Sequence, residues 1–354
     1  MLNIISSAID TLELTYGKTR ISYPVMEALV DAKADAALNN NRRSEVVFGS
    51  HRFHVLSHGA GFFQYLLNGV HFDLKICVSE KMSMIGVRVK SISIYELGIH
   101  KVLEELAGVV ADLRGDPSER RATVKRLDIC VDFQGWEPKL SDLKHFVCKA
   151  KKRGVYLEPD EPNYFRFGKN EMVVRLYNKG EEIRHSNKLW MIDVWKQNPH
   201  FNPEKPIWRL EVQLRRQALK NLNVDYTSEA LEQLSGIWVY GLEWLELKKP
   251  TKNKQKSRWP TDPRWVDLRR NAGFVGKPCE PVRAKKRAVD EERIVRMFGA
   301  YTSSFAAIRG YENMELGEVI YRAGVLYHNQ LEAKGLDFSE VVRGKMNPDS
   351  GFPF

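Results

Sequence analysis

Several features are missing from the 354-residue sequence, and each absence excludes a class of protein. No apolar run reaches the ~18 residues that a membrane-spanning helix needs. The opening residues, MLNIISSAIDTLEL, lack the basic start of a secretory signal, so the sequence predicts no export. The four cysteines are widely spaced and form no CxxC pair, which argues against a zinc cluster or a disulfide scaffold. We therefore expect a cytoplasmic protein without a membrane partner.

Three chemical motifs are also missing. The sequence has no Walker A motif, so we expect any DNA unwinding to come from a separate helicase. None of the nine histidines is followed by another two residues later, which excludes the His-hydrophobic-His metal site of the HUH nickases. No histidine has an arginine three residues later, which excludes the His-x-x-Arg motif of tyrosine recombinases.

The sequence does contain an excess of basic residues and enough apolar residues for a core. Lys and Arg total 55 and Asp and Glu total 45, which gives a net charge of +10 and a pI of about 9.3. Such a pI is typical of nucleic-acid-binding proteins, although many basic proteins bind none. Hydrophobic residues make up 43% of the chain, so extensive disorder is excluded.

The order of predicted elements indicates an α+β protein built from two similar halves of mostly antiparallel sheet with flanking helices. The halves cover about residues 1–115 and 122–247, and a basic linker (248–290) leads to a small helical C-terminal region (291–354). Periodicity and turn signals predict helices at Pro24–Ala37, Ile99–Leu113, Asp142–Lys152, Glu229–Leu247, Glu291–Ile308 and Leu316–Leu331. Short strands, among them Thr11–Tyr16, are predicted between the helices of each half.

Three predicted strands carry charged residues on one face and apolar residues on the other, because strand side chains alternate. The strands are Arg126–Phe133, Val173–Lys179 and Trp208–Arg215. Their polar faces present Arg126, Asp128, Cys130 and Asp132; Arg175, Tyr177 and Lys179; and Arg209, Glu211, Gln213 and Arg215. One interpretation is a solvated outer face of an antiparallel sheet, with mixed charges paired across strands.

The other interpretation is a catalytic site. Asp128, Asp132 and Glu211 would provide the oxygen ligands that Mg²⁺ or Mn²⁺ prefers. The phenol of Tyr177 could attack a DNA phosphate and form a phosphotyrosine. Arg175 and Lys179 flank this tyrosine on the same face and could neutralise the phosphate.

These motifs, in this order, resemble those of the rolling-circle replication initiators of small plasmids (the Rep_trans family) and the related MobT-type relaxases of integrative elements. The segments that carry the resemblance are RLDICVDF (126–133), RLYNKGEE (175–182) and WRLE (208–211). The resemblance implies a metal-dependent enzyme that nicks and rejoins DNA through Tyr177, with Asp128, Asp132 and Glu211 as its acidic metal-site residues. It further implies that an origin or transfer origin is the substrate, single-stranded or in a hairpin at the nick, and that a homodimer forms.

Basic residues beyond the catalytic candidates are predicted to contact DNA phosphates. They are Arg126, Arg209, Arg215, Lys248, Lys249, Lys252, Lys254, Lys256, Arg258 and Arg264. A solvated linker is the alternative for 248–258, and the C-terminal helices could bind DNA or form a dimer interface. Two other functions remain open: a non-nicking, sequence-specific DNA-binding regulator, and a metal-dependent nuclease whose nucleophile is water.

Overall fold

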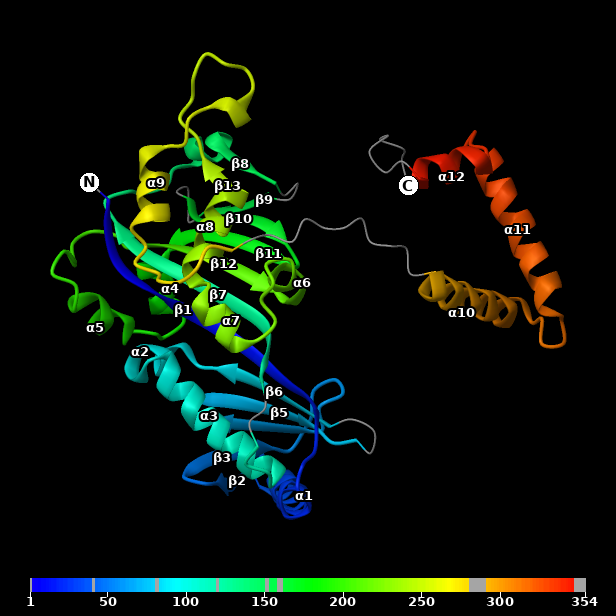
Figure 1. Cartoon of the computed structure of the whole chain (residues 1–354), viewed down its shortest axis with the longest axis horizontal. Coiled ribbons are helices and arrows are strands. Elements are labelled where there is room, and N and C mark those ends of the chain that lie inside the picture. The colour runs from blue at the N-terminus through cyan, green and yellow to red at the C-terminus, as the bar shows by residue number, and fades with distance from the viewer. Residues whose placement is uncertain are drawn as a thin grey trace. The chain divides into compact units, whose positions relative to one another are not determined.

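The computed structural model describes residues 2–39, 42–79, 83–118, 121–149, 153–157, 162–279 and 291–346 (Figure 1). The chain divides into two units, Met1–Arg283 and Ala284–Phe354, which are described separately. The basic cluster at 283–287 and the tail at 347–354 lie outside the described residues.

The first unit is organised around one eleven-stranded sheet, in the order β2-β3-β4-β5-β6-β1-β7-β12-β11-β10-β9, and all its neighbours are antiparallel. The strands are β1 (Asn3–Thr19), β2 (Arg43–Phe48), β3 (His51–Leu56), β4 (Tyr65–Gly69), β5 (Phe72–Cys77), β6 (Ser83–Val89), β7 (Thr123–Gln134), β9 (Arg153–Leu157), β10 (Pro162–Lys169), β11 (Met172–Asn178) and β12 (Trp208–Arg215). A separate two-stranded sheet pairs β8 (Phe146–Cys148) with β13 (Leu245–Leu247).

Strand β1 joins the two halves because it pairs with β6 on one side and with β7 on the other. It is much longer than the Thr11–Tyr16 strand that the sequence predicts. The β1–β7 pairing contains bulges, one of which falls between Ile9 and Thr11, so that Asp10 is the extra residue. A bulge bends a strand and changes the direction of a side chain, and this one places Asp10 at the polar face described below.

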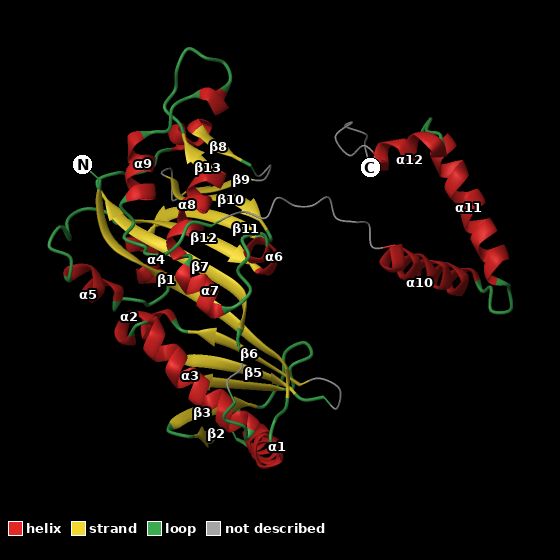
Figure 2. Ribbon diagram, viewed as in Figure 1, coloured by secondary structure: helices red, strands yellow, loops and turns green. Residues whose placement is uncertain are grey.

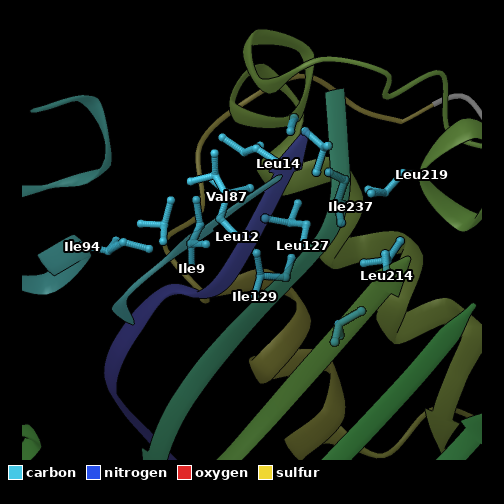
Figure 3. Close-up of a cluster of buried hydrophobic side chains, with 14 of the residues drawn as sticks. Ile9, Leu12, Leu14, Val87, Ile94, Leu127, Ile129, Leu214, Leu219 and Ile237 are labelled. Atoms are coloured by element: carbon cyan, nitrogen blue, oxygen red, sulfur yellow. The ribbon is translucent and has the colours of Figure 1, made fainter. Parts of the chain in front are cut away.

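Helices flank this sheet (Figure 2). They are α1 (Tyr23–Leu38), α2 (Ser91–Leu97), α3 (Ile99–Arg114), α4 (Lys179–His185), α5 (Met191–Lys196), α6 (Arg216–Lys220), α7 (Thr227–Glu232), α8 (Leu234–Trp244) and α9 (Pro263–Arg270). The helices cover apolar strand faces, and Figure 3 shows part of the resulting core, where Leu127, Leu214 and Ile237 lie among residues from β1, β6 and α6. Helix α8 approaches β12 closely at Gly241, where a Cβ atom would lie 2.7 Å from the Val212 side chain.

Two predicted helices are wrong in part. The segment predicted as Asp142–Lys152 forms a short 3₁₀ helix (Leu140–His145) followed by β8, and residues 150–152 lie outside the described part. Phe146 is buried against Phe167 and Trp265, so tertiary packing overrides the helical periodicity. The segment predicted as Glu229–Leu247 forms α7, α8 and β13 instead of one helix.

The second unit contains helices α10 (Glu291–Arg309), α11 (Leu316–Glu332) and α12 (Phe338–Met346). The sequence predicts the first two, and α12 was missed. A large antiparallel sheet with flanking helices and a small helical C-terminal region confirms the predicted α+β class. None of the helices in the described ranges is both long enough and apolar enough to cross a membrane.

Candidate active site

The polar face of β7, β11 and β12 is buried, which rules out a solvated outer face. Asp128, Asp132 and Arg209 are 0% exposed, and Glu211 is 5% exposed. Side chains from α2 and α5 contact this face through Tyr95 and Trp195. Burying charges costs several kcal/mol for each ion unless each charge has a partner, so the pairings on this face determine what it can do.

Strand register decides which side chains are neighbours. Arg175 lies opposite Glu211, and Tyr177 lies opposite Arg209, in the pairing of β11 with β12. Arg209 in turn lies opposite Asp132 in the pairing of β12 with β7. The alternation read from the sequence thus gives the correct shared face, and the register adds the order of residues across it.

The hydroxyl of Tyr177 donates a hydrogen bond to Oε2 of Glu211 over 3.0 Å. Arg175 donates to the other oxygen of the same carboxylate and, through Nη2, to Oε1 of Gln213 at 2.5 Å. Glu211 is therefore held by Arg175 with one oxygen directed at the phenol. A nucleophile, a base and a third group that orients the base form the general pattern of an activated nucleophile.

Burial, together with the charge of Glu211, raises the pKa of Tyr177 well above its ordinary value of 10. The side chain is 8% exposed, and its ring packs beside that of Tyr164 with 5.9 Å between centroids. The ammonium of Lys179 lies 5.6 Å from the ring centre and pairs with Glu182. Because the phenol holds its proton so strongly, an attack by its oxygen requires a proton acceptor, and Glu211 is already in place.

Asp128 lies on the other side of Arg175. Its Oδ1 accepts a hydrogen bond from Nε of Arg126 at 2.9 Å, and its Oδ2 is 4.0 Å from Nη1 of Arg175. Burial and the nearby charge of Glu211 raise the pKa of Asp128 to about 7, despite the opposing effect of the two guanidinium groups. Asp128 and Glu211 thus both lie close to Arg175, and Arg126 pairs with Asp128 as well.

The structure does not bring Asp132 to the other two carboxylates. Asp132 accepts hydrogen bonds from Nε and Nη2 of Arg209 at 2.6 and 2.9 Å, and from the indole of Trp195 at 2.8 Å. Arg209 also donates to Asp10 at 2.5 Å. Asp132 and Arg209 therefore form a buried ion pair that ties β7 to β12 and β1, and their predicted roles as metal ligand and DNA contact stay predictions.

Metal binding stays a prediction, with a smaller ligand set than the sequence suggests. In the described residues no group of three or more His, Cys, Asp and Glu side chains is placed to hold a metal ion. Asp128 and Glu211 are two carboxylates close to the same arginine, and the pKa of Asp128 is raised mainly by burial and to a lesser extent by the charge of Glu211. Mg²⁺ is commonly held by one or two carboxylates together with substrate phosphates, so the two residues fit such an ion.

A cavity of about 460 Å³ opens over these residues. Its lining includes Asp10, Arg88, Arg126, Asp128, Tyr164, Arg175, Tyr177, Lys179, Lys188 and Glu211. This volume is in the range of small-molecule sites and suits a nucleotide rather than a duplex. The cavity brings the phenol of Tyr177, the carboxylates of Asp128 and Glu211 and several cations to one place.

The remaining DNA-binding candidates lie away from this cavity. Arg215, Lys249, Lys252, Lys254, Lys256 and Arg258 are exposed. Lys248 is buried and pairs with Glu246 at 2.7 Å, while Arg264 pairs with Asp262 and lies over the ring of Trp136. Arg126 is occupied by Asp128, as described above.

Several cavity and support residues were missed by sequence reasoning. Tyr164 lies opposite Tyr177 in the register and could have been found from the alternation of β10. Arg88 lines the cavity from β6, in the first half of the chain. It reaches the cavity because β1 pairs with β6 on one side and with β7 on the other. Tyr95 and Trp195 lie in helices, and no sequence signal relates them to the strands.

Comparisons with solved structures found a likeness of fold. No family model and no curated protein matches the sequence. A solved structure described as a rolling circle replication initiator protein from Geobacillus stearothermophilus is similar at 16% sequence identity and a TM-score of 0.46. The similarity covers 78% of this chain and 98% of that one.

Proposed function

We propose that this protein is a site-specific DNA nicking-closing enzyme that initiates rolling-circle replication or transfer of a mobile element. The observation that carries the proposal is the hydrogen bond from Tyr177 to Glu211, inside a cavity whose lining includes Arg88, Arg126, Arg175, Lys179 and Lys188. A tyrosine that only supports the core has no need of a carboxylate oriented by a separate arginine.

The chemistry follows from these contacts. Glu211 accepts the phenolic proton as the oxygen of Tyr177 attacks a DNA phosphorus. The new bond joins that oxygen to phosphorus, and the bond from phosphorus to the 3′ oxygen breaks. The products are a 5′-phosphotyrosyl linkage and a free 3′ hydroxyl, which takes up a proton. The hydroxyl can prime synthesis, and its return attack on the linkage restores the phosphodiester.

Cations around the phenol stabilise the charge that develops on the phosphate. Arg175 lies beside Glu211 and has a planar group suited to phosphate oxygens, and Lys179 lies close to the ring of Tyr177. A bound Mg²⁺ or Mn²⁺, held by Asp128 and Glu211, would polarise the same phosphate.

The cavity size supports a single-stranded or hairpin segment at the nick, since a paired duplex could not present one nucleotide to a recessed phenol. We propose that the exposed lysines and arginine between 249 and 258 bind flanking phosphates of the origin or transfer origin. We further propose that a separate helicase unwinds the DNA and that the protein acts as a homodimer.

The test compares wild type with Tyr177→Phe on supercoiled DNA that carries the coding region, with Mn²⁺ present. We expect wild type to convert it to the open circle, and Tyr177→Phe to bind equally well without nicking. Binding without nicking by wild type would instead indicate a DNA-binding regulator. Nicking that survives in Tyr177→Phe would indicate a nuclease with water as its nucleophile.

A further inference from the structure

The polar face of the active site continues onto an open sheet face in the first half of the chain. In strands β3, β5 and β6 buried and exposed residues alternate. Helices α1 and α3 pack on the buried side, and Figure 2 shows α3 running across these strands. The other side presents His54, Lys75 and Arg88 to solvent. This side, from β3 to β6, is called the open face below.

Strand register connects the open face to the cavity. A single row of directly opposed residues crosses the sheet in the order His54, Asn68, Asp73, Arg88, Glu13 and Arg126. Arg126 and Arg88 both line the cavity that contains Tyr177. Arg88 therefore belongs both to the lining of the cavity and to the open face.

The charge on the open face favours an anionic partner. Its acids are paired with cations: Asp73 lies 3.3 Å from Lys90, and Glu13 lies 3.8 Å from Arg126. Lys75 and Arg88, by contrast, form no ion pair with any residue in the described ranges. Two cations are thus available to phosphates, and the acids that could repel phosphates are neutralised.

Aromatic side chains lie next to these cations. Gly86 is directly opposite Lys75, and a Cβ atom at Gly86 would lie 3.4 Å from the ring of Phe63. Phe63 therefore covers the glycine on the open face. Its neighbour Phe62 is 61% exposed, and the two rings are 4.3 Å apart. Cations beside exposed aromatic rings are typical of surfaces that bind nucleic acid through phosphates and stacked bases.

The dimensions suit a short length of DNA. Neighbouring strands lie about 4.8 Å apart, so the three steps from β6 to β3 span roughly 14 Å. The axial rise between nucleotides of one B-DNA strand is about 3.4 Å, so this width can hold a few nucleotides.

We propose that the open face is a second DNA-binding surface, which holds the phosphates of the DNA that continues from the nick site. Arg88 forms the boundary with the cavity, Lys75 contacts a phosphate, and Phe62 stacks on a base. This inference rests on the proposed function because the DNA is assigned through the cavity. The DNA assigned to this surface is a single strand, because the adjoining cavity suits an unpaired nucleotide and the exposed ring of Phe62 can stack only on an unpaired base.

The test measures affinity against salt concentration for Lys75→Glu, with three probes: a six-nucleotide single strand, a thirty-nucleotide single strand and a thirty-base-pair duplex, all of mixed sequence. Lys101→Glu is the matched control, since Lys101 is an exposed lysine on α3, on the covered side of the same sheet. All variants also carry Tyr177→Phe, so that no cleavage occurs, and thermal melting checks that they fold.

We expect Lys75→Glu to weaken binding of a long probe severalfold and to reduce its salt slope by about 1, as for the loss of one phosphate contact. The six-nucleotide probe and Lys101→Glu should show neither effect. Phe62→Ser should weaken binding of the long single strand. An effect of Lys75→Glu confined to the duplex would overturn the assignment of a single strand to this surface.

An unchanged salt slope in Lys75→Glu, or an equal loss in Lys101→Glu, would overturn the proposal. Its failure is separable from that of the proposed function. If wild type forms a covalent adduct but Lys75→Glu binds normally, only the open face fails. If no adduct forms but the salt slope falls, the surface stands and the nicking chemistry fails.

Discussion

Tyr177 and Glu211 lie on adjacent strands and are joined by a 3.0 Å hydrogen bond in which the phenol is the donor. The bond forms across the β11–β12 pair. Glu211 is directly opposite Arg175, and it lies two residues along β12 from Arg209, which is opposite Tyr177. The sheet therefore fixes the positions of the proposed nucleophile, the proposed base and the arginine that orients this base.

Replacing Glu211 by Gln should slow covalent adduct formation by about 10²–10⁴-fold, because it removes the proton acceptor but keeps the shape. Since the pKa of Tyr177 is raised well above 10, the remaining rate should increase close to tenfold per pH unit between pH 7 and 9. Single-turnover adduct formation measures both effects. The control is Glu13→Gln, which changes a more exposed carboxylate of the same sheet. A Glu211→Gln variant as fast as wild type would contradict the role of this base.

Manganese should stabilise wild type against heat, since a ligand that binds the folded state alone raises the melting temperature. Asp128→Asn should lose this increase. Asp132→Asn should keep it, because the Asp132 carboxylate is occupied by Arg209 and Trp195. Thermal melting at several MnCl₂ concentrations measures the effect without relying on activity. Loss of the increase in Asp132→Asn alone would instead assign the metal to that residue.

Asp10→Asn should destabilise the protein by about 3 kcal/mol at pH 7, because it leaves the buried guanidinium of Arg209 with one partner fewer. Burial opposes ionisation of Asp10, but Arg209, Lys179 and Lys188 outweigh it and lower its pKa. A lowered carboxyl pKa gives stability that is present above pH ~4 and lost as the pH falls further. The penalty should therefore shrink at pH 3.

Urea unfolding at pH 7 and pH 3 measures this difference. Glu13→Gln is the comparison, because its longer and more exposed ion pair with Arg126 should contribute only about 0–1 kcal/mol. A penalty for Asp10→Asn that is equal at both pH values would contradict the assigned ion pair.

Gly241→Ala should destabilise the first unit by about 1–3 kcal/mol, because the added methyl group would meet the buried side chain of Val212. Gly108→Ala in helix α3 is the matched variant: nothing lies within 4 Å of its added Cβ, so it should stabilise by about 0.5–1 kcal/mol. Thermal or urea unfolding of the two variants distinguishes them. Equal effects would contradict the close approach of α8 to β12.

The sequence predicts the strands of the site well because alternation with period two is a local property. Arg175, Tyr177 and Glu211 could be placed on one face from their own strands. The partners of each residue depend on register and on bulges, which are set by the whole sheet, so Asp132 could not be separated from Asp128 in advance. Trp195 and Tyr95, which complete the ion pair of Asp132 and Arg209, come from helices and leave no periodic signal.

The long β1 strand was also beyond sequence reasoning. Its residues pair with β6 and β7 on opposite edges, and only the three-dimensional arrangement shows that the two predicted halves share one sheet. The helix predicted at Asp142–Lys152 fails for a related reason, since Phe146 is buried by residues more than twenty positions away.

The most direct test of the nicking chemistry incubates the protein and Mn²⁺ with a pool of overlapping single strands of DNA. Together the strands cover the DNA that carries the coding sequence, and each strand is labelled at its 3′ end. On a denaturing gel, wild type should retain label at the position of the protein, and mass spectrometry should locate the nucleotide on Tyr177. Tyr177→Phe should show no such band. A labelled band that persists in Tyr177→Phe, or cleaved DNA with no protein-linked label in wild type, would contradict the account.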